Sequence, residues 1–121
     1  MPATPISRVT AEHYLWGGKD NKESDGWYLV RTPTLNIIEE RLPPAASETR
    51  HYHKLSRQFF YVLSGELTME IEHHIYVLQP GEGIEIAPGQ SHQAANKGSA
   101  GLSILVTSQP PSHGDRYEAE V

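Results

Sequence analysis

The sequence predicts an all-β domain, either a sandwich or a barrel, and three observations indicate this. From residue 49 onward, short apolar segments alternate with turn residues at regular spacing, which is typical of such folds. No long segment has the apolar spacing of a helix, so alternating strand–helix units are not expected. The length of 121 residues suits one domain with its own core.

The composition excludes several classes of protein. Hydrophobic residues make up 37% and charged residues 21% of the chain, as in ordinary soluble proteins. There are no cysteines, which excludes disulfides, thiolate metal sites and a cysteine nucleophile. The formal net charge of −5 argues against nucleic acid or an anionic membrane as a partner. Because the sequence has neither a secretory signal pattern nor an apolar stretch of membrane length, we expect a cytoplasmic protein.

The first thirty residues predict an N-terminal arm, residues 1–30, that packs on a barrel or on a dimer partner. Residues Thr10–Trp16 favour a short helix that ends at Gly17 and Gly18. A solvated, charged loop is expected over residues 19–26, and a strand over residues 27–30.

The rest of the chain predicts a barrel over residues 31–108 and a C-terminal tail over residues 109–121. The segment Glu66–Glu72 alternates apolar and polar residues and indicates a half-buried strand, with a tight turn expected at His73 and His74. Strands are expected over residues 35–42, 50–53, 58–63, 66–72, 75–78, 84–87, 92–95 and 101–107. The apolar wall inside the barrel should contain Leu67, Met69, Ile84, Ile86, Leu102, Ile104 and Val106.

Three of the seven histidines form a candidate metal site. His51 and His53 are two residues apart on an expected strand, so their side chains point to the same face. His92 can approach them from a different strand. Neutral imidazole is the commonest side-chain ligand for transition metals. The spacing alone fits solvated strand residues equally well, and His13, His73, His74 and His113 carry no such pattern.

The residues around these histidines resemble two sequence motifs of the cupin superfamily. The segment His51–Gly65 reads HYHKLSRQFFYVLSG and is similar to H-x-H-x(3,4)-E-x(6)-G, with Gln58 in place of the glutamate. The segment Gly81–Asn96 reads GEGIEIAPGQSHQAAN and is similar to G-x(5)-P-x-G-x(2)-H-x(3)-N, with Ala87 in place of the proline. Together the motifs span residues 51–96, and the length between them resembles that of small bacterial monocupins.

The resemblance implies a single jelly-roll β-barrel, also called a double-stranded β-helix, with one metal site. Carried over residue by residue, it makes His51, His53 and His92 metal ligands and places Gln58 at the fourth ligand position. The ion would be one divalent transition metal, and the sequence does not distinguish Ni, Mn, Zn, Fe, Co and Cu. A neutral amide oxygen in place of a carboxylate should weaken metal binding and raise the Lewis acidity of the ion.

Glutamine at this position resembles cupins of pectin degradation that act on unsaturated uronates, and some polyketide cyclases. We therefore expect a metal-dependent enzyme of isomerase, lyase or cyclase type that acts on a sugar acid or a cyclic ketone. The alternatives are a metal-dependent dioxygenase and a non-enzymatic domain that binds or senses a small ligand. The partner is expected to be a small molecule, not nucleic acid or a membrane, and no residue is assigned a catalytic role.

In two of the expected strands, the choice of which alternate residues face inward decides what lines the pocket and what is left on the outer face. If Gln58 points inward, Phe60 does too and is a possible pocket residue, while Phe59, Tyr61 and Leu63 point outward. An apolar outer face needs a cover, which the segment Tyr14–Trp16 or a second subunit could supply; we expect a homodimer. The strand over residues 35–41 could direct either of two sets inward: Asn36, Ile38 and Glu40, or Ile37, Glu39 and Arg41.

Overall fold

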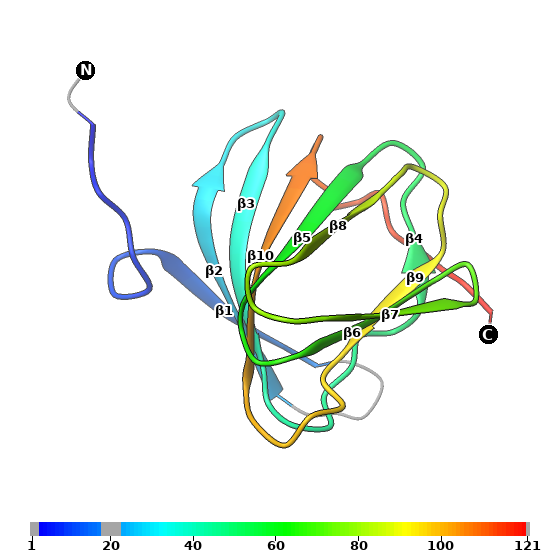
Figure 1. Cartoon of the computed structure of the whole chain (residues 1–121). Coiled ribbons are helices and arrows are strands. Elements are labelled where there is room, and N and C mark those ends of the chain that lie inside the picture. Colours follow the sequence, from blue (N-terminus) through cyan, green and yellow to red (C-terminus); the bar gives the residue numbers. More distant parts are fainter. Residues whose placement is uncertain (1–2, 18–22, 121) are drawn as a thin grey trace.

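The computed structural model describes residues 3–17 and 23–120, and within these ranges the chain forms strands and no helix. The strands form two antiparallel sheets that face each other (Figure 1). The prediction of an all-β domain is confirmed. Their bounds are β1 Glu12–Gly17, β2 Glu23–Arg31, β3 Asn36–Leu42, β4 His51–Tyr52, β5 Arg57–Ser64, β6 Leu67–Ile71, β7 His74–Leu78, β8 Gly83–Ile86, β9 His92–Ala95, β10 Leu102–Gln109 and β11 Tyr117–Glu118.

The order of the strands brings distant parts of the chain together. One sheet has the order β1-β2-β3-β10-β5-β8, and the other has the order β11-β4-β9-β6-β7. The second sheet therefore contains β4 and β9, which carry His51 and His92 of the two sequence motifs, as neighbours. The expected C-terminal tail contributes β11, which pairs with β4 at the edge of that sheet.

The predicted helix over residues 10–16 is wrong. Residues 12–17 form β1, which pairs with β2 from Glu12 opposite Tyr28 to Gly17 opposite Glu23. The side chains of this segment alternate, with His13 and Leu15 exposed and Tyr14 and Trp16 half-buried, which is the period of a strand. The predicted charged loop over residues 19–26 is also wrong for residues 23–26, because these residues begin β2. Residues 18–22 lie outside the described part of the chain.

The core lies between the two sheets and follows the predicted parity. Gln58, Phe60 and Val62 of β5 are buried, and the alternate residues of β5 are exposed. Of the predicted apolar wall, all members are buried except Ile84, which is partly buried and packs against the core. The core cluster contains Leu42, Ala46, Phe60, Val62, Leu67, Met69, Ile71, Ile86, Ala94, Leu102, Ile104 and Val106.

The turns after β5 and after β6 contain residues with positive φ angles. Gly65 has a φ of 84°, and an added Cβ would lie 2.5 Å from the carbonyl oxygen of Gly101, so only glycine fits this turn. The hairpin between β6 and β7 turns at Glu72 and His73, whose φ values are 49° and 71°. This turn begins one residue earlier than predicted. The described residues contain no helix that is long and apolar enough to span a membrane.

Candidate metal centre

Three imidazole rings meet between β4 and β9. His51 lies on β4 directly opposite His92 on β9, and His53 follows one residue after the end of β4. The ring centroids are 4.4 Å apart for His51 and His92, and 4.9 Å apart for His51 and His53. One nitrogen of each ring lies within 4.8 Å of the corresponding nitrogens of the other two. The structure thus places the three histidines in a group that could hold a metal ion.

Backbone carbonyl groups fix the tautomer of each ring. Nδ1 of His51 hydrogen bonds to the carbonyl oxygen of Thr49 at 2.6 Å, and Nδ1 of His92 to that of Gln90 at 3.0 Å. Nδ1 of His53 hydrogen bonds to the carbonyl oxygen of Asp115 at 2.6 Å. Since a carbonyl oxygen only accepts, each Nδ1 carries the proton and each Nε2 keeps its lone pair, as in metal-binding histidines.

The protonation state of the rings also suits a metal. Burial lowers the pKa of His51 to about 3 and the pKa of His92 to about 4. Both rings are therefore neutral at physiological pH, which is the form that binds a metal ion.

Among the buried atoms without a hydrogen-bond partner are three on His53, Gln58 and His92 that can donate an electron pair to a metal. Nε2 of His53, Nε2 of His92 and Oε1 of Gln58 are buried without a hydrogen bond. Leaving such an atom unpaired costs about 1–3 kcal/mol. Gln58 donates from Nε2 to Oγ of Ser108 at 3.0 Å, which leaves its Oε1 available. These electron-pair donors fit a divalent transition metal. They do not fit an anion or a cofactor that must accept hydrogen bonds, because none of the three atoms carries a proton to donate.

The C-terminal segment helps to hold the candidate metal centre in place. The sequence did not indicate this role. The carboxylate of Asp115 accepts hydrogen bonds from the backbone N–H groups of Lys54, Leu55 and Ser56, each at 2.9 Å. Its carbonyl group holds His53. One residue near the end of the chain thus fixes both a candidate ligand and the loop that follows it.

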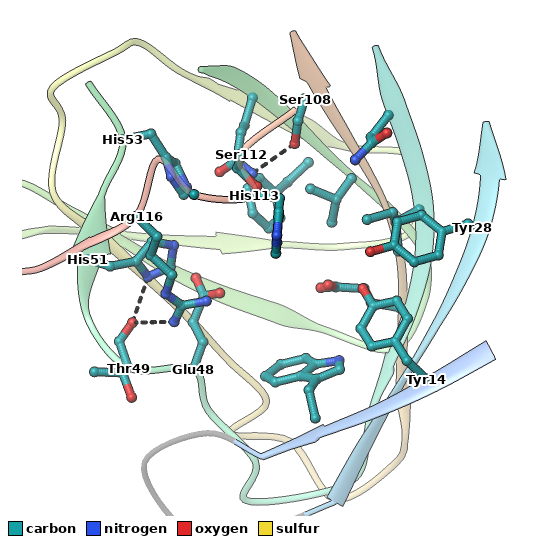
Figure 2. A pocket seen from close by; sticks show the side chains of 18 of the residues that line it. Tyr14, Tyr28, Glu48, Thr49, His51, His53, Ser108, Ser112, His113 and Arg116 are labelled. Carbon is teal, nitrogen blue, oxygen red and sulfur yellow. Dashed lines mark hydrogen bonds between the residues drawn. The ribbon is translucent and has the colours of Figure 1, made fainter. Parts of the chain in front are cut away.

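Two of the three histidines, His51 and His53, line a cavity of about 510 Å³. Figure 2 shows Tyr14 and Tyr28 on one side of it and His51, His53 and Arg116 on the other. Phe60, expected as a possible pocket residue, lines this cavity and packs edge-on to His92 at a centroid distance of 6.3 Å. A space of this size holds a small molecule.

Three carboxyl groups line the same cavity, those of Glu40, Glu48 and Glu118. Glu40 is on β3, where the structure selects Asn36, Ile38 and Glu40 as the inward set. Burial and the nearby charge of Glu48 raise the pKa of Glu40 to about 8, although Arg116 and Tyr14 act in the opposite direction. Burial raises the pKa of Glu48, whose Oε1 accepts a hydrogen bond from the backbone N–H of Ala94 at 2.9 Å.

The remaining histidines divide into two groups. His13 is exposed and pairs with Asp25 at 2.8 Å, and His73 and His74 are exposed at the β6–β7 hairpin. His113, which showed no pattern in the sequence, lines the cavity. Tyr14, Glu48 and Arg116 were also missed, because each comes from a segment whose place beside the motifs depends on pairing between distant strands.

A family comparison decides where this chain belongs. A family model described as a cupin domain matches residues 38–108, more than half of the chain. The chain belongs to the cupin family. In sequence, this cupin is 34% identical over 80 residues to uncharacterized protein MJ1618 of Methanocaldococcus jannaschii, and 28% identical over 69 residues to the tetracenomycin polyketide synthase protein TcmJ of Streptomyces glaucescens. These matches cover 64% and 57% of the cupin, but only 64% and 46% of the two relatives.

Solved structures confirm the jelly-roll fold. The cupin is similar to a sugar phosphate isomerase of the cupin superfamily from Silicibacter pomeroyi, with a TM-score of 0.81 and 19% identity over 98% of this chain and 83% of that one. It is equally similar to the polyketide cyclase RemF from Streptomyces resistomycificus, with a TM-score of 0.81 and 19% identity over 99% of this chain and 87% of that one. At these identities the likeness concerns the fold.

Proposed function

We propose that this cupin is a metal-dependent enzyme that carries out isomerase, lyase or cyclase chemistry on a small polar molecule. The observation that carries the proposal is the set of unpaired, buried donor atoms on His53, His92 and Gln58, and His53 and Gln58 also line the cavity. Nε2 of His51 would complete the set. An ion held there would supply a Lewis acid that polarises a carbonyl or hydroxyl oxygen. The structurally similar proteins include a sugar phosphate isomerase and a polyketide cyclase, which supports this class.

The ligands that this chain offers favour non-redox chemistry. Three neutral imidazoles and a neutral amide leave the full charge of a divalent ion in place, which strengthens its Lewis acidity. A 2-His-1-carboxylate iron site would need a carboxylate among the ligands, and position 58 supplies an amide instead.

Arg116 favours a substrate that carries a carboxylate. This residue lines the cavity, and its hydrogen bond goes to the carbonyl oxygen of Thr49 at 3.4 Å. Among the described residues, no carboxylate oxygen lies within 4.0 Å of its guanidinium group. A guanidinium group can bind a carboxylate through two hydrogen bonds. We therefore place sugar acids ahead of neutral cyclic ketones.

The metal site is tested first, without any substrate. Elemental analysis of the purified protein should find a transition metal, and added Ni, Mn, Zn, Fe or Co should raise the melting temperature of metal-free protein. The double variant His51→Ala with His53→Ala should stay folded and lose that rise, while His73→Ala with His74→Ala should keep it. A wild-type protein that neither contains nor responds to any of these metals contradicts the proposed function.

The reaction class is tested by proton exchange. Metal-loaded protein would be incubated in D₂O with pyruvate and with 2-keto-3-deoxygluconate, each of which has a carboxylate and acidic C–H protons beside a ketone. NMR should show exchange of those protons with wild type and none above free metal with the double histidine variant. An oxygen electrode run in parallel should stay flat; oxygen consumption that depends on either compound would indicate a dioxygenase instead. Tight binding without exchange would indicate a sensing domain.

A further inference from the structure

A row of three residues crosses the first three strands at the wall opposite the histidines. Tyr14 on β1 lies opposite Gly26 on β2, and Gly26 lies opposite Glu40 on β3. Side chains in such a row share one face of a sheet, so the first and third are normally separated by the second. Here the second residue has no side chain.

Gly26 lets Tyr14 cross the row. A Cβ added to Gly26 would lie 2.2 Å from Cζ and 2.5 Å from the hydroxyl oxygen of Tyr14. The phenol ring therefore occupies the space above the glycine, and its hydroxyl comes within hydrogen-bonding reach of the carboxyl group of Glu40. Tyr14 keeps its own proton, because burial and the nearby Glu40 raise its pKa. It can thus donate a hydrogen bond to Glu40.

The surroundings make both protonation states of Glu40 accessible. Burial and the charge of Glu48, which precedes β4, favour the neutral carboxyl group. Arg116 from the C-terminal segment and the hydroxyl of Tyr14 favour the carboxylate. Tyr28 on β2 packs against Tyr14, with ring centroids 5.1 Å apart. The opposing influences bring the pKa to about 8, within reach of physiological pH, which suits a group that both accepts and returns a proton.

We propose that Glu40 is the acid–base residue of this cupin and that Tyr14, crossing Gly26, is the residue that positions it. Both line the cavity that His51 and His53 also line, and Figure 2 shows Tyr14 across the cavity from these two histidines. A substrate in this cavity would lie between His51 and His53 on one wall and Glu40 on the other. The inference deepens the proposed function and rests on it.

The proposed step is the transfer of one proton beside a carbonyl group. The Glu40 carboxylate accepts the proton of the C–H bond next to the carbonyl, and the electron pair of that bond becomes the carbon–carbon double bond of an enolate. The carbonyl π electrons move onto its oxygen. Glu40, now neutral, returns the proton to carbon, and the electrons move back. No oxidant or reductant is consumed.

The exchange assay in D₂O tests the role of Glu40. Glu40→Gln should lower metal-dependent exchange from pyruvate or 2-keto-3-deoxygluconate by about 100-fold or more, which is the usual contribution of a general acid–base group. Glu85→Gln, which changes an exposed glutamate on β8 outside the cavity, should not lower it. If wild type exchanges and Glu40→Gln exchanges equally fast, this inference fails and the proposed function stands. If wild type shows no metal-dependent exchange, the proposed function fails and the inference falls with it.

The positioning role of Tyr14 is tested by titration midpoints, because a simple loss of packing would not shift them. Tyr14→Phe keeps the ring and removes the hydroxyl, so the midpoint at which exchange rises with pH should move upward. In metal-free protein labelled with ¹³C at glutamate carboxyl carbons, the titration midpoint of Glu40 should move in the same direction. Tyr76→Phe, at an exposed residue on β7, should move neither. Unchanged midpoints in Tyr14→Phe would overturn the positioning role of Tyr14.

Discussion

Each of the three imidazoles is oriented by a different piece of backbone. The carbonyl groups of Thr49 and Gln90 each lie two residues before the histidine that they hold, while that of Asp115 lies far along the chain. Hydrogen bonds of this kind fix ring orientation and raise the basicity of the nitrogen that faces a metal. The geometry of the group is therefore set by the fold before any ion binds.

At the same scale, Gln58→Glu should tighten metal binding. A carboxylate adds a negative charge to the donor set, and its second oxygen can accept a hydrogen bond from the hydroxyl of Ser108. Because ligand charge strongly tunes affinity, we expect the dissociation constant for Zn²⁺ or Ni²⁺ to fall at least about tenfold, measured by competition with a chelator. Gln109→Glu adds the same charge at an exposed position and should change little. Equal affinities for wild type and Gln58→Glu would mean that residue 58 does not touch the ion.

The sequence predicted the candidate ligands but not the residues around them. His51, His53 and His92 could be found because strand parity and motif spacing are local properties. Glu48 has the opposite parity to His51, and it lines the same cavity because residues 48–50 lie outside the regular strand that begins at His51. Arg116 belongs to a segment with no apolar alternation. Such residues become visible only when the two sheets are packed together.

At the scale of elements, the β1–β2–β3 row depends on the missing side chain at its centre. Gly26→Ala should destabilise the protein by about 1–3 kcal/mol, which is typical of an added methyl group in a filled space, because the ring of Tyr14 must move. Gly17→Ala is a matched control on the neighbouring strand, where an added Cβ meets nothing within 4 Å. Chemical denaturation should show the loss for Gly26→Ala alone; similar losses in both variants would argue against the close approach of Tyr14.

The C-terminal segment makes a separate prediction about the metal. Asp115→Ala removes the carboxylate that holds the backbone of residues 54–56, although this carboxylate is not a candidate ligand. We expect metal affinity to fall by about 10–100-fold, as for other groups that orient a ligand, while the overall fold remains. Asp25→Ala, which removes a half-buried carboxylate paired with His13 away from the histidine group, should leave affinity unchanged. Chelator competition on the two variants would show the difference.

The strands after residue 35 followed the expected pattern, whereas β1 did not, and β2 did so only over the expected residues 27–30. Residues 35–108 alternate apolar and polar side chains between turn residues, and this pattern is sufficient to locate most strands. Residues 12–26 contain Gly17, Gly18 and several charged residues, which weaken the local signal for a strand. β1 exists because its backbone pairs with β2 over six residue pairs. Its formation is therefore a consequence of the sheet and not of local propensity.

For the whole molecule, the free energy of unfolding of the metal-free protein should be greatest at mildly acidic pH. It should fall both as the pH is lowered and as the pH is raised from there. His51 and His92 have pKa values lowered to about 3 and about 4, so the unfolded chain binds protons that the folded chain rejects, and stability falls as pH drops below about 6.5. Glu40 acts in the opposite sense: its raised pKa of about 8 gives stability at low pH that is lost as pH rises from about 4.5 to 8.

Thermal unfolding of metal-free protein between pH 4 and pH 8 would separate these contributions. Glu40→Gln should flatten the decline on the alkaline side and leave the acid side as in wild type. Glu85→Gln should follow wild type throughout. A wild-type melting temperature that responds to pH in the same way as Glu40→Gln would show that Glu40 titrates normally.

The outer face of β5 bears on assembly. Phe59, Tyr61 and Leu63 are 43%, 36% and 41% exposed on neighbouring outward positions, and β1 lies at the far end of the same sheet and does not cover them. We predict that two copies of the chain bury this face against each other. Sedimentation should give a dimer for wild type and a monomer for Phe59→Glu with Leu63→Glu. Wild type that sediments as a monomer at micromolar concentration would contradict the prediction.

The path of the last residues affects how the protein should be purified. Glu118 lines the cavity. The backbone N–H of Ala119 donates a hydrogen bond to the carbonyl oxygen of Arg50, and the guanidinium group of Arg50 donates one to the carbonyl oxygen of Glu120. A polyhistidine tag would follow this segment directly, and its imidazoles would compete with the candidate ligands for a metal ion. Figure 1 shows the N-terminal segment on the opposite side of the molecule. An affinity tag placed there and cleaved before elemental analysis leaves the native ligands without a competitor.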